Sequence, residues 1–165
     1  MQLQVELLAK HHDLSQFECG KPALDNWLRK WALPSLASGS ARTFVVHRDG
    51  LVVGYYSICT GSVRREEAPE RIAKGQAAHP IPVILLARLA VDQREHGKGL
   101  GAALLKDALS RIAEAIDIVA ARAVLVHAID DEARGFYRHF DFEESPVDQY
   151  QLMLLVKDLR RSLSG

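Results

Sequence analysis

The sequence is poor in cysteine, has no long hydrophobic run and carries no net charge, and each absence excludes a class of protein. Its two cysteines, Cys19 and Cys59, form no metal-binding or redox motif, so both are expected to be reduced thiols. No apolar run approaches the roughly 20 residues that span a membrane. The N-terminus lacks the pattern of a signal peptide. We therefore expect a cytoplasmic protein without a membrane-spanning segment.

Acidic and basic residues are equal in number, 21 of each, which excludes a global attraction to nucleic acid or to membranes. A polyanionic partner would have to bind a local basic patch. The chain of 165 residues has an ordinary share of hydrophobic side chains, 48%, and neither internal repeats nor a linker. The sequence thus predicts one domain over residues 1–165.

The most informative stretch predicts a strand, a glycine-rich turn and a helix. Residues 83–91 form a short apolar run typical of a central strand buried on both faces. Glycines follow at positions 97, 99 and 101. Apolar side chains then recur with helical spacing. They are Leu100, Leu104, Leu105, Ala108, Leu109, Ile112 and Ile116.

A glycine-rich turn before a helix can bind an anion, because the first N–H groups of a helix lack partners and glycine leaves them accessible. Arg94 and Lys98 are expected to add positive charge. The alternative is a tight turn without a ligand. No Walker A motif is present. Gly97, Gly99 and Ala102 satisfy the dinucleotide fingerprint, but some eighty residues precede the strand that leads into the turn, and that position excludes a doubly wound fold.

Arg94-x-x-Gly97-x-Gly99 after Leu89-Ala90-Val91 resembles the acetyl-CoA signature of the GNAT superfamily of N-acetyltransferases. Further segments, in the same order over nearly the whole chain, resemble the GNAT toxins of type II toxin–antitoxin pairs. They are Phe17–Gly20, Leu24–Leu28, Arg42–Val46, Val53–Ser57, Pro80–Val83, Ala87–Asp92 and Phe136-Tyr137. Asp141, in Phe140-Asp141-Phe142, stands where this family usually has glycine.

The resemblance implies the GNAT acyl-CoA N-acyltransferase fold. This is a mixed, twisted α/β sheet in which the parallel strands 83–91 and 123–127 splay to admit acetyl-CoA, with helices on both faces. It implies no metal. The residues expected to bind the cofactor are Leu89, Ala90, Val91, Arg94, Glu95, His96, Gly97, Lys98, Gly99, Leu100, Gly101, Ala102, Ala133 and Phe136.

Tyr137 is the candidate general acid, because a phenol with a pKa of about 10 can protonate a departing alkyl thiolate. The family tyrosine at this position has that role. No general base stands out, since His79, His127 and His139 are more simply surface or structural histidines. An α-amine, with a pKa of about 8, is partly neutral at pH 7 and suits an enzyme without a strong base.

The resemblance also implies that this α-amine belongs to an aminoacyl-tRNA, whose acetylation blocks translation. It implies a small antitoxin, of the ribbon-helix-helix type, through which operator DNA is bound, and a homodimer. Phosphate contacts would come from basic side chains. Those expected to bind substrate are Arg29, Lys30, Arg42, Arg64 and Arg65. Two alternatives remain open: acetylation of a protein or small-molecule amine, and a non-enzymatic corepressor that binds acyl-CoA.

The remaining pattern predicts a first strand over residues 2–8 and hairpin strands over 43–48 and 52–62. A helix is expected from Pro22 to Leu33-Pro34, with Trp27 and Trp31 packed in the core or a dimer. His11-His12 is expected in a solvated turn. Residues 64–79 are expected to form a charged loop or flap, and residues 157–165 a frayed end.

Overall fold

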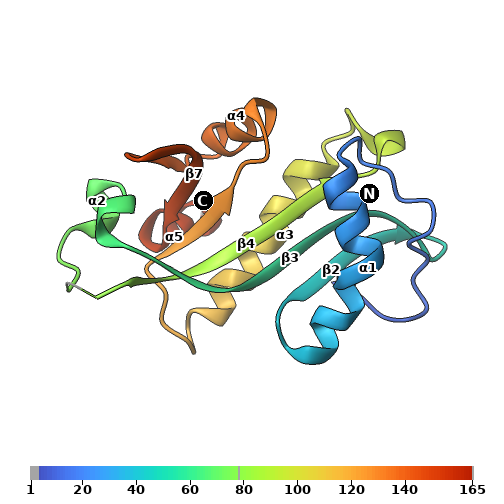
Figure 1. Ribbon diagram of the computed structural model, residues 1–165, viewed down its shortest axis with the longest axis horizontal. Coiled ribbons are helices and arrows are strands. Elements are labelled where there is room, and N and C mark those ends of the chain that lie inside the picture. The colour runs from blue at the N-terminus through green and yellow to red at the C-terminus, as the bar shows by residue number, and fades with distance from the viewer. Residues whose placement is uncertain (1–3, 78, 165) are drawn as a thin grey trace. The chain divides into compact units, whose positions relative to one another are not determined.

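The computed structural model describes residues 4–77 and 79–164 (Figure 1). The elements are β1 (Glu6–Leu7), α1 (Pro22–Ser38), β2 (Arg42–Arg48), β3 (Leu51–Val63), η1 (Arg65–Glu67), α2 (Glu70–Ala73), β4 (Ile81–Val91), η2 (Gln93–Glu95), α3 (Leu100–Ala115), β5 (Ala123–His127), α4 (Asp131–His139), β6 (Glu143–Ser145), β7 (Asp148–Leu155) and α5 (Val156–Ser164). Within this part of the chain, no helix is both long and apolar enough to cross a membrane.

The strands follow the order β1-β2-β3-β4-β5-β7-β6. β4 and β5 pair in parallel from Val83↔Ala123 to Leu86↔Val126, whereas β2–β3 and β5–β7 are antiparallel. β5 ends one residue after this pairing, and β4 continues to Val91. The predicted mixed α/β sheet with a parallel central pair is therefore confirmed, and β4 extends beyond the pairing where the splay was expected.

Two compact units alternate along the chain. The first comprises residues up to Cys59 and Arg88–Ala108, and the second comprises Thr60–Ala87 and the residues from Leu109 onward. β3, β4 and α3 each contribute one part to either unit. The glycine-rich turn lies in the first unit and α4, with Tyr137, in the second.

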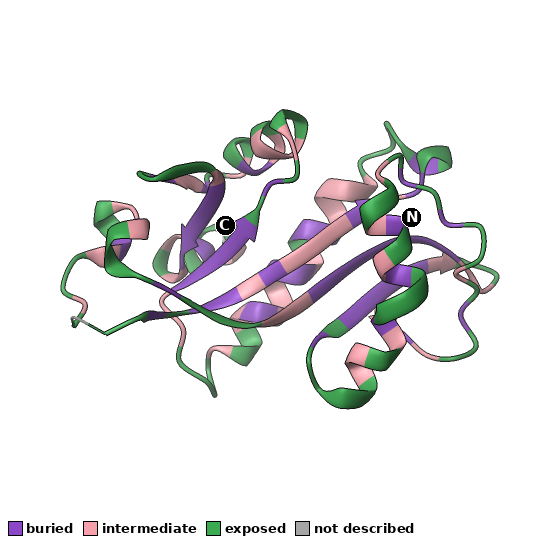
Figure 2. Cartoon of the chain, viewed as in Figure 1, coloured by how far each residue is buried: buried purple, intermediate pink, exposed green. Residues whose placement is uncertain are grey.

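In the first unit, α1 and the first turns of α3 cover opposite faces of β2 and β3 (Figure 1). Adjacent tyrosines of β3 show this alternation. The Tyr55 hydroxyl donates to the Leu24 carbonyl of α1 at 2.8 Å, and the Tyr56 hydroxyl donates to Asp107 of α3 at 2.5 Å. Gly54 lets α3 approach closely, because a Cβ there would meet Leu104 Cδ1 at 2.9 Å. The strand interiors are buried, and α1 turns its polar side outward (Figure 2).

The second unit has its own core, formed by Ile72, Ile81, Val83, Ala123, Leu125, Met153 and Leu155. Arg71 links three parts of this unit. Its guanidinium pairs with Asp158 of α5 at 2.8 Å and with Glu143 of β6 at 3.1 Å. Leu159 of α5 is fully buried. The expectation that residues 157–165 fray is therefore wrong for the described part, since α5 is anchored by both contacts.

Other expectations also need correction. α1 does not end at Pro34 but continues to Ser38, because the proline faces solvent, where water can satisfy the carbonyl that its missing N–H leaves unpaired. Gly39, with φ +81°, ends the helix. Trp31 is 58% exposed, which excludes packing in the core, and its expected packing in a dimer stays a prediction. The first strand is limited to Glu6–Leu7, and residues 2 and 3 of its predicted range lie outside the described residues.

Candidate active site

The glycine-rich turn has a backbone that glycine alone adopts readily. Gly97 and Gly99 both have φ of +79°, in the left-handed region, and a Cβ on either would point into open space. The conformation, rather than crowding, thus requires glycine here. It leads from the end of β4 through η2 into α3.

This turn offers backbone donors that the protein itself does not use. Among the described residues, none accepts a hydrogen bond from the N–H groups of residues 97–102, whereas the Ala103 N–H donates to the Gly99 carbonyl at 3.1 Å. Such a run of free N–H groups at a helix start is suited to an anion of phosphate type. The sequence prediction of an anion-binding turn therefore has the expected geometry.

Asp92 fixes the start of the turn. Its buried carboxylate accepts hydrogen bonds from Arg94 Nε at 2.8 Å, Arg94 Nη2 at 3.0 Å, the Arg94 N–H at 2.9 Å and the Glu18 N–H at 3.0 Å. Burial alone would raise the pKa of Asp92, but these bonds outweigh it and lower the pKa to about 2. Asp92 therefore remains charged and holds Arg94 in place.

Glu95, three residues after Asp92, anchors the same segment before the glycines. Its side chain, 9% exposed, accepts bonds from Arg48 Nη2 at 2.5 Å and Nε at 3.2 Å, and Lys98 Nζ lies 3.6 Å away. The pair with Arg48 lowers the pKa of Glu95. The expectation that Arg94 and Lys98 supply free positive charge thus needs correction, since carboxylates offset both. An anion would depend mainly on backbone N–H groups.

Other residues of the predicted cofactor segment contact β4 and the core. The His96 ring bonds through Nε2 to the Val91 carbonyl at 2.7 Å, so the imidazole closes the turn back onto β4. Ala90 is buried in the core beside Tyr55 and Leu28. A cavity of about 370 Å³ adjoins the turn, and its lining includes Arg48, Glu95, Lys98, Gly99 and Leu100.

Tyr137 lies on α4 in the second unit, where Asp130 caps the helix by accepting from the Ala133 N–H at 2.9 Å. The tyrosine is 7% exposed and packs against Phe136 and Phe142, at ring-centre distances of 5.2 and 5.4 Å. Burial raises the pKa of its phenol above 10. Its hydroxyl bonds to no other described residue, so the proton is not already committed.

Asp141, two residues beyond α4, has φ of +70°. Its left-handed conformation explains why the family usually has glycine at this position, and aspartate tolerates it better than most residues. The turn after Tyr137 therefore keeps the geometry that glycine would allow.

The predicted substrate-binding side chains are not equivalent. Lys30 and Arg42 are exposed, while Arg29 donates to the Phe17 carbonyl at 2.7 Å. In the second unit, Arg64 pairs with Glu67 at 3.2 Å and Glu66 at 3.6 Å, and Arg65 donates to the Gln76 carbonyl. The structure thus groups Arg29 and Lys30 on α1 and partly neutralises Arg64.

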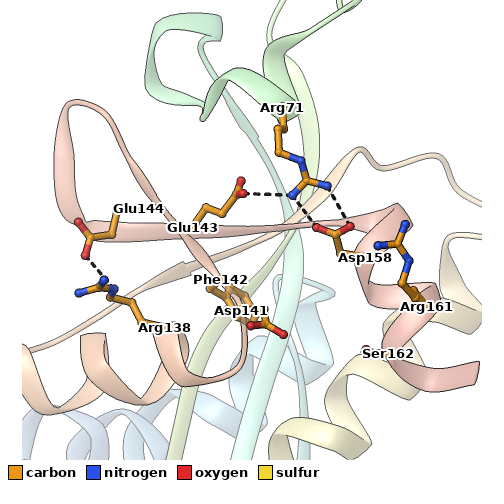
Figure 3. A pocket seen from close by; sticks show the side chains of 9 residues that line it. All are labelled: Arg71, Arg138, Asp141, Phe142, Glu143, Glu144, Asp158, Arg161 and Ser162. Carbon is orange, nitrogen blue, oxygen red and sulfur yellow. Dashed lines mark hydrogen bonds and ion pairs between the residues drawn. The ribbon is translucent and has the colours of Figure 1, made fainter. Parts of the chain in front are cut away.

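A separate, highly charged pocket of about 800 Å³ lies in the second unit (Figure 3). Arg71, Arg138 and Arg161 line it together with four carboxylates, and Arg71 and Arg138 already pair with acidic neighbours. Its positive charge is therefore largely compensated. Sequence reasoning did not find this pocket, since its residues come from distant segments.

The His11-His12 pair differs from expectation because His12 is buried. Its Nδ1 accepts the Ala9 N–H at 2.9 Å, which assigns the proton of a neutral ring to Nε2, facing Glu6 at 3.0 Å. His47 makes the same arrangement, with Nδ1 on the Gly50 N–H and Nε2 on Glu6. Glu6, His11 and His12 are near enough to hold a metal, but these bonds occupy Nε2 with a proton. The absence of a metal remains a prediction.

With the fold and both parts of the site described, comparison with known proteins identifies the class. Residues 39–144 match the GNAT acetyltransferase domain. The chain belongs to the GNAT family and is an acetyltransferase.

Within that family, the chain is 53% identical to the tRNA-acetylating toxin of Mycobacterium tuberculosis over 148 residues, which cover 90% of this chain and 89% of that protein. Two solved structures at 25% identity are also similar. AtaT complexed with acetyl-methionyl-tRNAfMet has a TM-score of 0.90, with 98% of this chain and 99% of that one covered. A tyrosine-to-phenylalanine variant of AtaT bound to the C-terminus of the antitoxin AtaR and acetyl-CoA has a TM-score of 0.84, with 100% of each covered.

Proposed function

We propose that this protein transfers the acetyl group of acetyl-CoA to the α-amine of an aminoacyl-tRNA and thereby blocks translation. The observation that carries the proposal is the 53% identity to a tRNA-acetylating toxin across 90% of the chain. The free N–H groups of the glycine-rich turn are consistent with it. The amino acid and the tRNA that are selected are left open.

The turn would hold the diphosphate of acetyl-CoA, because the N–H groups of residues 97–102 have no partners among the described residues and the left-handed glycines present no Cβ. Asp92 and Glu95 act as positioning residues that hold the turn. Acetyl-CoA supplies a thioester, and backbone N–H groups near Leu89 and Val91 would polarise its carbonyl. Ala133 and Phe136 of α4 are assigned to the same cofactor.

Tyr137 would act as the general acid. The free α-amine attacks the carbonyl carbon, the carbon–sulfur bond breaks, and the phenol hydroxyl gives its proton to the thiolate. Water takes the proton that the nitrogen loses as it becomes an amide, and the phenolate regains a proton from solvent. Burial raises the pKa of the phenol, so the proton stays on oxygen at neutral pH until the thiolate departs. The attacking amine needs no strong base, since an α-amine is partly neutral at pH 7.

The substrate would contact Arg29, Lys30 and Arg42 through its phosphates. Arg64 and Arg65 are weaker candidates, because each already bonds to a neighbouring group. We further propose a cytoplasmic homodimer that is inhibited by a small ribbon-helix-helix antitoxin and reaches operator DNA only through it. The structures of AtaT with AtaR, one of them also bound to DNA, support the antitoxin part.

The test is mass spectrometry of aminoacyl-tRNA after incubation with the protein and acetyl-CoA, beside Tyr137→Phe. We expect acetylated aminoacyl groups with the unaltered protein, and a loss of at least a hundredfold in rate with the variant. Acetyl-CoA binding by the variant should be retained, which separates chemistry from folding. Absence of product from every aminoacyl-tRNA, with acetyl-CoA bound, would reject the proposal.

The second candidate is acetylation of a protein or small-molecule amine. The neutralised Arg64 favours it, since a phosphate-binding surface would keep that charge free. Transfer to peptide or polyamine substrates in the same assay, with no label on tRNA, would establish it.

A further inference from the structure

Arg88 of β4 carries a charge that the protein leaves without a counter-ion. Its guanidinium lies 3.9 Å from the centre of the Trp27 ring, in a half-buried position. Among residues 4–77 and 79–164, no carboxylate pairs with it and no group accepts a hydrogen bond from it. By contrast, Arg48, Arg71 and Arg94 all pair with acidic side chains. Unlike these three arginines, Arg88 therefore has no acidic partner among the described residues.

Half-burying a charge without a counter-ion is unfavourable, and burial correspondingly lowers the pKa of Arg88. The stack on Trp27 compensates only part of this cost. Stacking uses only one face of the guanidinium. The five N–H donors in its plane remain available, in the fork that matches a phosphate or a carboxylate.

The surroundings hold this fork in place. The Trp27 ring stacks on Tyr55 at 6.2 Å and 12°, and the Tyr55 hydroxyl bonds back to the Leu24 carbonyl of α1. Ser57 shares the α1-facing side of β3 with Tyr55. Its hydroxyl also has no hydrogen-bond partner within the described structure. These contacts fix the Trp27 ring on which Arg88 stacks. The Arg88 guanidinium and the Ser57 hydroxyl both lack a hydrogen-bond partner within the described residues.

The charged and aromatic side chains on the neighbouring surface of α1 indicate the kind of anion that Arg88 would bind. Its exposed charged side chains include Arg29 and Lys30, whereas its one carboxylate, Asp25, is buried and accepts from the Cys19 N–H at 2.9 Å. One turn beyond Trp27, Trp31 is 58% exposed. Positive charge interleaved with aromatic rings is typical of proteins that bind single-stranded RNA, where arginine and aromatic planes stack on bases and arginine forks bind phosphates.

We propose that Arg88, held on the Trp27 ring, binds a phosphate group of the single-stranded 3′ end of the aminoacyl-tRNA. This inference rests on the function proposed above and assigns one anchor of its substrate. Arg88 directly precedes Leu89–Val91, the part of β4 assigned to the thioester. A phosphate fixed at Arg88 would therefore place the 3′ end beside the strand where acetyl transfer takes place.

The experiment follows RNA binding through the fluorescence of Trp27. The sequence has two tryptophans, so Trp31→Phe leaves Trp27 as the single tryptophan. This protein is titrated with a short single-stranded RNA ending in CCA, at several salt concentrations. Adding Arg88→Gln should weaken binding about tenfold, as expected for losing hydrogen bonds to a charged group. It should also reduce the slope of log K against log[salt] by about 0.7, the value for one phosphate contact on a single strand.

Lys106→Gln is the matched control, because it removes one exposed positive charge from α3, and it should change neither quantity. The thermal unfolding midpoint and acetyl-CoA binding verify that each variant is folded. If Arg88→Gln does not fold, Arg88→Lys decides, since lysine keeps the charge but loses the fork and should bind RNA several-fold more weakly with an unchanged slope.

Equal RNA affinity and equal slope in folded Arg88→Gln would overturn the proposal and leave Arg88 a packing residue. Unchanged RNA binding with weakened binding of a glutamate-rich peptide would reassign the site to an acidic protein segment. The outcome does not depend on catalysis, because RNA binding is measured without acetyl transfer. If no aminoacyl-tRNA is acetylated but Arg88→Gln still weakens RNA binding, the proposed activity is wrong, whereas the assignment of Arg88 as an RNA phosphate contact is supported.

Discussion

Single carboxylates determine how the glycine-rich turn is held. Asp92 collects four hydrogen bonds from Glu18 and Arg94, and Glu95 holds Arg48 and lies close to Lys98. In the sequence, Asp92 falls in a segment that resembles the family and Glu95 in the expected cofactor segment, but neither pattern predicts these contacts. Their roles depend on contacts with residues 18 and 48, which are far away along the chain and cannot be inferred from local pattern.

Asp92→Asn is expected to lower the free energy of unfolding by about 1–3 kcal/mol near neutral pH, because it replaces hydrogen bonds to a charged group by neutral ones. The pKa of Asp92 is about 2 in the folded protein and about 3.9 when unfolded. Its contribution is thus complete above about pH 5 and is lost as the pH falls through 4 toward 2. Urea unfolding of both proteins at several pH values measures the difference.

Asp49→Asn, at an exposed turn residue, is the control and should leave unfolding nearly unchanged. A gap between the Asp92→Asn variant and the unaltered protein that persists undiminished at pH 2.5 would show that shape, rather than charge, gives Asp92 its role.

At the scale of elements, the period of apolar residues predicted most of the fold. The apolar runs at 83–91 and 123–127 lie in β4 and β5. Of the stripe predicted from Leu100 to Ile116, the part from Leu104 to Ile112 became the buried face of α3, whereas Leu100 is only half-buried and Ile116 follows the end of the helix. Two predictions were wrong for physical reasons: the end of α1 at Pro34 and the fraying of residues 157–165. Pro34 is tolerated because it lies on the exposed side of α1, and α5 is stable because Leu159 and Asp158 find partners in the second unit.

Leu159→Ala tests the anchoring of α5. The side chain is 0% exposed, so its removal should cost about 2–5 kcal/mol of unfolding free energy, measured in urea. Leu163→Ala, at a half-buried position one turn further on, should cost clearly less. Equal, negligible losses from both variants would restore the view that this end of the chain is frayed.

For the whole molecule, the net charge of zero means that no overall electrostatic attraction draws the protein to a polyanion such as tRNA. Attraction must come from a few local side chains, of which Arg29, Lys30, Arg42 and Arg88 are the proposed set. With about 0.7–0.9 per neutralised phosphate, these contacts predict a slope of log K against log[salt] of roughly −3 for tRNA.

Filter binding of uncharged tRNA between about 50 and 200 mM salt measures that slope. A slope approaching −10, as expected for a broad basic surface, would be incompatible with the proposed set of contacts. The composition alone anticipated a local patch, but which cations remain free became apparent only from their ion pairs.

The two compact units alternate along the chain, which passes between them at residues 59–60, 87–88 and 108–109. No continuous fragment short of residue 108 contains the whole first unit, and Tyr137 follows later still. During synthesis, a nascent chain therefore cannot assemble the glycine-rich turn within its completed unit until most of the protein has emerged. A ribosome that stops early releases a piece without the proposed acid. For a protein proposed to act against translation, its own unfinished copies would be harmless to the machinery that makes them.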